Sequence, residues 1–81
     1  MISCANHDYV EIACMYGFEI KLVLIDGKIV SGKALQTAVN KAKEECIVLH
    51  TDQGIEKFEL SQAISMEAVT NNPHFKTIDF K

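Results

Sequence analysis

The acidic residues near the start of the chain are the first candidates for a chemical role. Residues 1–20 hold Asp8, Glu11 and Glu19 and no lysine, whereas residues 21–81 hold the other eight acidic residues and all eight lysines. The chain has no arginine, and its net charge is −3. This net charge therefore comes from the first quarter of the chain. An acidic end on a neutral body favours binding to a basic partner.

These acids do not form the catalytic constellation of an enzyme. No histidine or serine at a suitable spacing joins Asp8 and Glu11 in a general acid–base or nucleophilic arrangement. Glu44 and Glu45 are adjacent, and on a strand they would point to opposite faces. The chain has neither a Gly-x-Ser-x-Gly sequence nor a phosphate-binding P-loop. We therefore expect neither an enzymatic activity nor a cofactor.

The cysteines and histidines do not indicate a metal site. The cysteines are odd in number and form no Cys-x-x-Cys pair, and the histidines are scattered: Cys4, Cys14, Cys46, His7, His50 and His74. A zinc site would need more ligands at suitable spacing. We expect no bound metal, and we expect the cysteines to be reduced thiols in a cytoplasmic protein.

The lysines do not resemble those of a nucleic-acid-binding surface. Most of them alternate with acidic residues along the chain, and Lys41 and Lys43 fall in an expected loop. A protein that binds single strands presents a basic groove with stacking aromatic side chains. Here most aromatic residues occupy expected core positions. The sequence therefore predicts no direct nucleic-acid binding.

Residues 7–16 are expected to form a short helix that begins after an Asn6 N-cap and ends at Gly17. At 3.6 residues per turn, one side of this helix is apolar and contains Tyr9, Val10, Ala13 and Cys14. The other side carries Asp8, Glu11 and Met15, with Ile12 at its edge.

The two helix acids have two possible explanations. Carboxylates near a helix start are stabilised by the helix dipole, and they are solvated there without any partner. Alternatively, they belong to an interface, because Ile12 and Met15 add apolar groups beside the carboxylates on an outward face. The charge segregation favours the interface.

After Gly17 the hydrophobic period changes to two, which is typical of strands. Asp26-Gly27 is a hairpin signal, and Gly32 suggests a bulge or sharp bend. Residues 35–45 have no clear apolar stripe and are expected to form a loop with room for one helical turn. The expected strands cover residues 18–25, 28–34, 46–51, 55–60, 64–69 and, as a possible sixth, 77–80.

This order predicts a mainly β fold, a small antiparallel β-barrel with one N-terminal α-helix. We expect a single domain over residues 1–81, with the helix at about 7–16 and the barrel strands at about 18–80. Apolar runs such as residues 22–25 are too short to span a membrane, and no secretory signal is visible.

The opening of the chain resembles that of the Rho-binding antiterminator family, the small bacterial proteins called Rof. The similar segment reads Ile-Ser-Cys-Ala-Asn-His-Asp-Tyr-Val-Glu-Ile-Ala-Cys over residues 2–14, and the family opening combines a Cys, acidic residues, a Tyr, a Glu, an Ala and a second Cys. The resemblance continues through Ile25-Asp26-Gly27 and Gly32-Lys33-Ala34 to the closing segment 75–80. It therefore covers nearly the whole chain.

The resemblance implies an Sm-like barrel that binds the N-terminal RNA-binding domain of the hexameric termination factor Rho. Such a protein covers the primary RNA site of Rho and blocks termination. Asp8 and Glu11 match the family acids, while Cys4, Ala13 and Cys14 match small inward positions. The residues expected to contact Rho are Asp8, Glu11, Asn6, His7, Ile12 and Met15, with Asn40 and Lys41 from the polar loop in second rank.

Two positions depart from the family pattern. Ala5 stands where the family often has an acid, and His7 stands where it often has a tyrosine. We expect the free protein to be a cytoplasmic monomer. The alternative function is that of an Sm-like RNA-binding riboregulator module that forms rings, which would need a basic, aromatic-lined surface.

Overall fold

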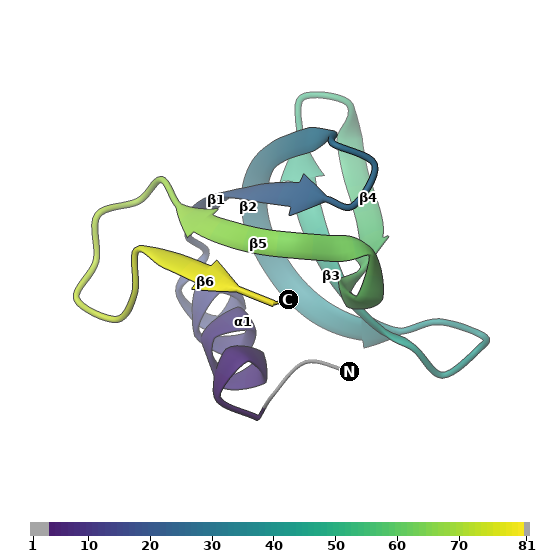
Figure 1. The fold of residues 1–81 in the computed structure, drawn as a ribbon. Coiled ribbons are helices and arrows are strands. Elements are labelled where there is room, and N and C mark those ends of the chain that lie inside the picture. Colours follow the sequence, from purple (N-terminus) through teal and green to yellow (C-terminus); the bar gives the residue numbers. More distant parts are fainter. Residues whose placement is uncertain (1–3, 81) are drawn as a thin grey trace.

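The computed structural model describes residues 4–80, and the side chains of residues 6–80. One helix precedes six strands (Figure 1), which confirms the mainly β class predicted from the sequence. The elements are α1 (Cys4–Tyr16), β1 (Glu19–Leu24), β2 (Ile29–Val39), β3 (Glu45–Thr51), β4 (Gly54–Glu59), the 3-10 helix η1 (Leu60–Gln62), β5 (Ala63–Ala68) and β6 (Thr77–Asp79).

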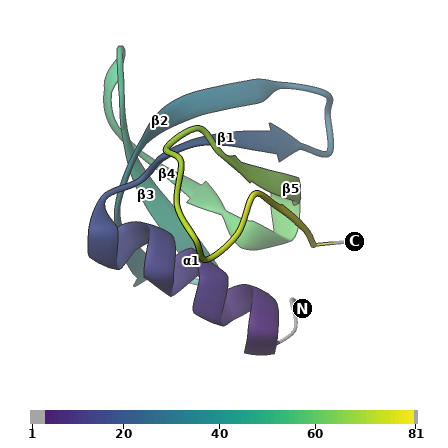
Figure 2. The same ribbon diagram turned by 90° about the vertical axis from the view of Figure 1, so that its left-hand side faces the viewer.

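The six strands form one antiparallel sheet in the order β4-β3-β2-β1-β5-β6. The sheet curls strongly, and the long β2 follows the curve (Figure 1). Within residues 4–80, its two edge strands are β4 and β6. Helix α1 lies against one end of the curled sheet, where it packs mainly on β2 and also meets β6 (Figure 2).

The core lies between the concave face of the sheet and α1. The helix contributes Val10 and Ala13, which are fully buried. The apolar side expected for the helix is therefore the side that packs on the sheet. The other buried members of this cluster are Phe18, Ile20, Leu22, Ala34, Ile47, Leu49, Leu60, Ala63, Met66, Ile78 and Phe80.

The helix ends where the sequence predicted. Gly17 has a φ of 65°, which residues other than glycine adopt at a cost. Its amide donates to the Cys14 carbonyl at 3.3 Å, and the Phe18 amide donates to the Ala13 carbonyl at 2.9 Å. These two bonds form a Schellman motif, which satisfies the last carbonyls of α1 and turns the chain into β1.

The second strand is longer than predicted. Residues 35–39 continue β2 instead of forming a loop, and only 40–44 connect it to β3. A bulge between Ala34 and Gln36 shifts the register against β3. Because a bulge interrupts the alternation of faces, this segment shows no regular period in the sequence, and pairing with β3 decides its structure.

Of the two features expected at Gly32, the bulge is wrong because the register does not shift there, and the sharp bend stays a prediction. The structural role of Gly32 is a close approach of two backbones, because a Cβ atom at this position would lie 2.8 Å from the His50 carbonyl oxygen of β3. The Asp26-Gly27 hairpin prediction is confirmed. The Leu24 amide donates to the Lys28 carbonyl at 2.8 Å, and the Asp26 carboxylate accepts from the Lys28 amide at 3.0 Å.

Candidate functional site: the outer face of helix α1

Helix α1 begins earlier than predicted. It starts at Cys4, so Asn6 lies inside the helix and is not its N-cap. The Asn6 side-chain amide instead donates to the Asp79 carbonyl at 2.9 Å, which ties α1 to the end of β6. This contact joins residues 73 positions apart in the sequence, so the local pattern could not reveal it.

The earlier start weakens the dipole explanation for the helix acids. No acidic residue lies in the first turn of α1, and Asp8 is the fifth residue of the helix. Favourable interaction with the dipole falls off within the first turn. The positions of Asp8 and Glu11 are therefore not explained by stabilisation of the helix start.

Asp8, Glu11 and Met15 lie on the exposed face of α1, as the periodicity predicted. Within residues 6–80, the Asp8 carboxylate takes part in no hydrogen bond or ion pair. Met15 is 72% exposed, and Ile12 is half-buried against the core. The outer face of α1 therefore presents carboxylates next to an accessible apolar side chain.

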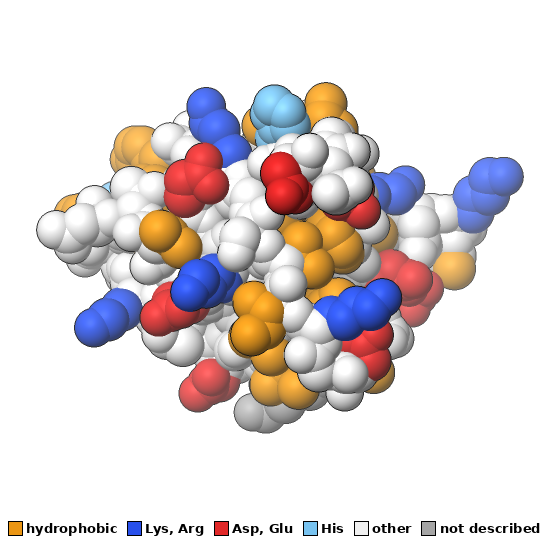
Figure 3. Space-filling view, turned by 90° about the horizontal axis from the view of Figure 1, so that it is seen from above, with side chains coloured by type: hydrophobic (Ala, Val, Ile, Leu, Met, Phe, Trp, Pro, Cys, Tyr) orange, Lys and Arg blue, Asp and Glu red, His pale blue; other side chains and the backbone are white. Residues whose placement is uncertain are grey.

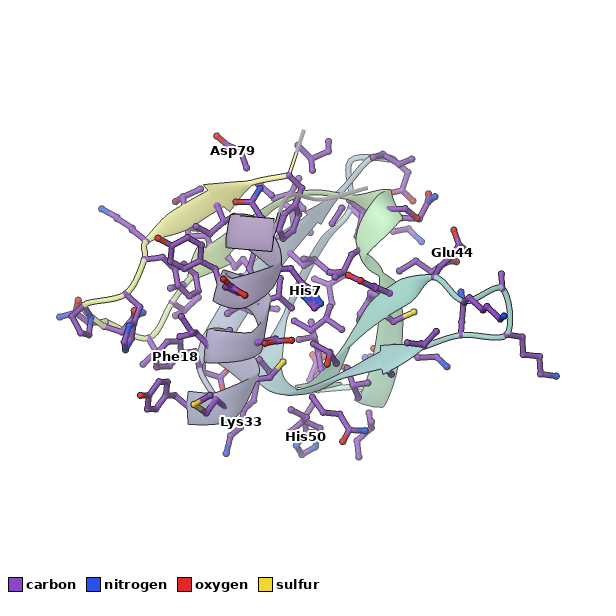
Figure 4. All side chains as sticks on the ribbon, turned by 90° about the horizontal axis from the view of Figure 1, so that it is seen from below. His7, Phe18, Lys33, Glu44, His50 and Asp79 are labelled. Atoms are coloured by element: carbon purple, nitrogen blue, oxygen red, sulfur yellow. The ribbon has the colours of Figure 1, made fainter. Side chains whose placement is uncertain are left out.

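His7 connects this face to the sheet. Its Nδ1 lies 3.7 Å from Glu11 Oε1, and its Nε2 lies 3.3 Å from Glu45 Oε2 at the start of β3. In Figure 4, His7 projects from α1 on the side of these strands. Glu45 thereby joins the acidic side of the molecule. Sequence reasoning missed Glu45, because its position depends on how α1 packs against β2 and β3.

Asn40 and Lys41, the second-rank candidates, belong to the loop between β2 and β3. The Asn40 side-chain oxygen accepts from the amides of Ala42 and Glu44, each at 2.9 Å, and its amide group donates to Glu44 Oε1 at 3.3 Å. Asn40 therefore shapes the loop. Lys41 is exposed, and Figure 4 shows this loop projecting away from the body of the molecule.

A second pair of carboxylates lies at the base of the same loop. A hydrogen bond between the side chains of Glu44 and Glu59 lowers the pKa of Glu44, and Asn40 lowers it further. The same bond, together with the Glu44 charge, raises the pKa of Glu59. Glu44 is exposed and Glu59 is half-buried, and both add to the acidic character beside Glu45.

The cysteines are placed as packing residues. Cys14 and Cys46 are free thiols, and the side chain of Cys4 lies outside the described residues. Burial raises the pKa of Cys14 to about 11, with a further contribution from the Glu11 charge, and burial also raises the pKa of Cys46. Since the thiolate is the reactive form, neither thiol is suited to nucleophilic chemistry.

The described residues offer neither a metal site nor a membrane-spanning helix. They contain no group of three or more His, Cys, Asp or Glu side chains placed to hold a metal ion. No helix among them is long and apolar enough to cross a membrane.

The end of the molecule opposite α1 has a different character. Figure 3 shows lysine and acidic side chains interspersed there, around a patch of hydrophobic side chains. Large exposed apolar residues in that region of the fold include Ile25 and Ile29 in the β1–β2 hairpin and Ile55 at the start of β4. That end of the molecule therefore presents both signs of charge.

The chain is similar to a known protein family and to a solved structure. A family model described as modulator of Rho-dependent transcription termination (ROF) matches residues 1–80. A solved structure described as YaeO bound to magnesium, from Vibrio cholerae O395, is similar with a TM-score of 0.86 and 39% sequence identity. That similarity covers 91% of this chain and 96% of the Vibrio chain. No curated protein matches the chain.

Proposed function

The chain belongs to the family of modulators of Rho-dependent transcription termination, and we propose that it inhibits termination by binding the RNA-binding domain of Rho through α1. The observation that carries this proposal is the outer face of the helix. Asp8 and Glu11 are exposed there, one turn apart, and the Asp8 carboxylate has no partner within residues 6–80.

The physical basis is competition for positive charge. A site that binds RNA must present lysines and arginines, because neutralising phosphates supplies much of the binding free energy. Carboxylates make charge-assisted hydrogen bonds with the same groups. An acidic helix that docks on the N-terminal RNA-binding domain of Rho would therefore exclude RNA by occupancy. No reaction and no cofactor are required, in keeping with a regulatory family.

The remaining candidate residues have graded roles in this proposal. Ile12 and Met15 supply apolar contact beside the carboxylates, and His7 holds Glu11 within reach of Glu45. Asn6 acts indirectly by fixing α1 to β6. Lys41 would contact Rho only at the edge of this interface, because its loop projects from the body of the molecule and away from α1.

We also propose that the free protein is a cytoplasmic monomer consisting of one domain. The alternative, a ring-forming RNA-binding module, would join copies through the sheet edges β4 and β6. Since β6 has only three residues, it offers few backbone groups for such pairing. The absence of arginine in the chain also disfavours a phosphate-binding surface.

Charge-reversal variants test the proposal. Asp8→Lys and Glu11→Lys should each abolish measurable binding to the isolated N-terminal domain of Rho by fluorescence anisotropy. Removing one partner of a desolvated charge pair costs about 2–5 kcal/mol, and reversal adds repulsion.

Asp52→Lys is the matched control, because Asp52 is exposed in the turn between β3 and β4 and the substitution makes the same change in net charge. It should bind like the wild type. Equal binding by all three variants would contradict the role of the helix acids.

A further inference from the structure

An exposed aromatic ring stands at the end of the acidic helix. Tyr16, the last residue of α1, is 59% exposed. Its ring stacks on Phe18, with centroids 5.6 Å apart and planes 16° apart, and on His74, at 5.3 Å and 18°. No local pattern in the sequence indicates this stack, because His74 comes from the segment between β5 and β6.

These contacts leave much of the Tyr16 ring accessible. Phe18 and His74 are laterally offset from Tyr16, because near-parallel rings with centroids 5.6 and 5.3 Å apart do not overlap fully. Since Tyr16 is 59% exposed, an aromatic surface is available to a partner.

The ring is held in place by a folded turn. The Asn72 side-chain oxygen accepts from the His74 amide at 2.9 Å and from the Phe75 amide at 3.1 Å, and the Asn72 amide group donates to the Thr70 carbonyl at 2.9 Å. His74 is thus presented to Tyr16 by a turn with its own hydrogen bonds. A ring that is already oriented loses less conformational freedom on binding.

The ring lies on the same helix as the acidic face. Tyr16 follows Asp8 by eight residues, which is about 12 Å along the helix axis and about 80° around it. Met15, which is 72% exposed, precedes Tyr16 in the last turn. Helix α1 thus carries both exposed carboxylates and an exposed aromatic ring. Single-stranded RNA offers the same two features to a protein, negative charges and flat bases.

We propose that Tyr16 takes the place of an RNA base on the N-terminal domain of Rho, by stacking on a side chain that otherwise stacks on RNA. This inference rests on the proposed function and adds a specific contact to it. Sites for single-stranded RNA bind bases on aromatic or guanidinium planes, and such stacking contributes about 1–3 kcal/mol per base. In this account Phe18 and His74 are positioning residues for the ring.

Ring-directed substitutions test the inference. Tyr16→Leu should weaken binding to the N-terminal domain of Rho about 5- to 150-fold. Tyr16→Phe, which keeps the ring, should bind within about twofold of the wild type. His74→Ser should weaken binding by a smaller factor, and His74→Phe should restore it. Because Tyr16 is exposed, thermal unfolding of Tyr16→Leu should resemble that of the wild type, and this measurement separates loss of contact from loss of fold.

Salt separates this contact from the charge contacts. The loss caused by Tyr16→Leu should be the same at low and high salt, whereas the loss caused by Asp8→Lys should shrink as salt rises. Wild-type binding by Tyr16→Leu alongside failed binding by Asp8→Lys would overturn the inference and leave the proposed function intact. Equal losses in Tyr16→Leu and Tyr16→Phe would also overturn it, because the hydroxyl and not the ring would then matter. Failure of the wild type to bind Rho would overturn both.

Discussion

The outer face of α1 and the loop 40–44 are both polar and exposed, yet their side chains are used differently. In the loop, the Asn40 side-chain oxygen accepts from two amides of the same loop, and Glu44 accepts a hydrogen bond from the Asn40 amide group. On the helix, Asp8 has no such partner within residues 6–80. Polar groups that satisfy one another stabilise local structure, whereas carboxylates that remain available suit recognition of another molecule.

The largest effect is expected on the opposite side of the same helix. Val10 is fully buried between α1 and the sheet. Val10→Asp would bury an unpaired carboxylate and should lower the free energy of unfolding by at least about 4 kcal/mol. Urea unfolding followed by circular dichroism checks this. If the free energy of unfolding of this variant lay within about 1 kcal/mol of the wild-type value, as for a surface substitution, α1 would not pack as described.

Neutralising the carboxylates on the outer face of α1 should weaken binding to Rho without unfolding the protein. The double variant Asp8→Asn/Glu11→Gln should bind the N-terminal domain of Rho at least about tenfold more weakly, because two charge-assisted contacts are lost. Its binding should also depend less on salt than that of the wild type. Titrations at two salt concentrations check both statements. An unchanged salt dependence would mean that the charges in contact lie elsewhere on the protein.

The loop should respond in the opposite way. Asn40→Ala removes the acceptor for two loop amides and should lower stability by about 1 kcal/mol, with little change in binding to Rho. Lys41→Ala should change the free energy of unfolding by no more than about 0.5 kcal/mol relative to the wild type. If Asn40→Ala instead weakened binding at unchanged stability, the loop would belong to the interface and the contrast with α1 would fail.

The smallest expected effect is a pH dependence at high pH. The pKa of Cys14 is about 11 in the folded protein and 9.0 for an unperturbed thiol. Because the pKa is higher in the folded protein, the Cys14 thiol contributes to the free energy of unfolding below pH 9. This contribution is lost as the pH rises toward 11. The wild type should therefore lose stability over this window relative to Cys14→Ala. Parallel curves for the two proteins would contradict the shift.

The sequence predicted the parts of the fold that depend on local signals. The two sides of the helix, its end at Gly17 and the hairpin at Asp26 follow from periodicity and turn chemistry, and all three were confirmed. The length of β2 and a bulge at Gly32 were predicted wrongly, because both depend on how β2 pairs with β3. The helix start was misplaced because Asn6, a plausible cap, bonds to the distant β6 instead.

The candidate site was predictable to a similar extent. The exposure of Asp8, Glu11 and Met15 followed from helical spacing. The neighbours that complete the face, Glu45 beside His7 and His74 beside Tyr16, are far away in the sequence and come together only through packing. Sequence patterns therefore located the helix face, and the structure was needed to find what surrounds it.

Competition with RNA tests the central claim most directly. Labelled single-stranded RNA bound to the N-terminal domain of Rho is titrated with this protein at low salt, and the anisotropy of the RNA is followed. The account predicts complete displacement of the RNA, with a midpoint that rises in proportion to the RNA concentration. A ternary complex, in which this protein and the RNA are bound to one Rho domain together, would contradict it.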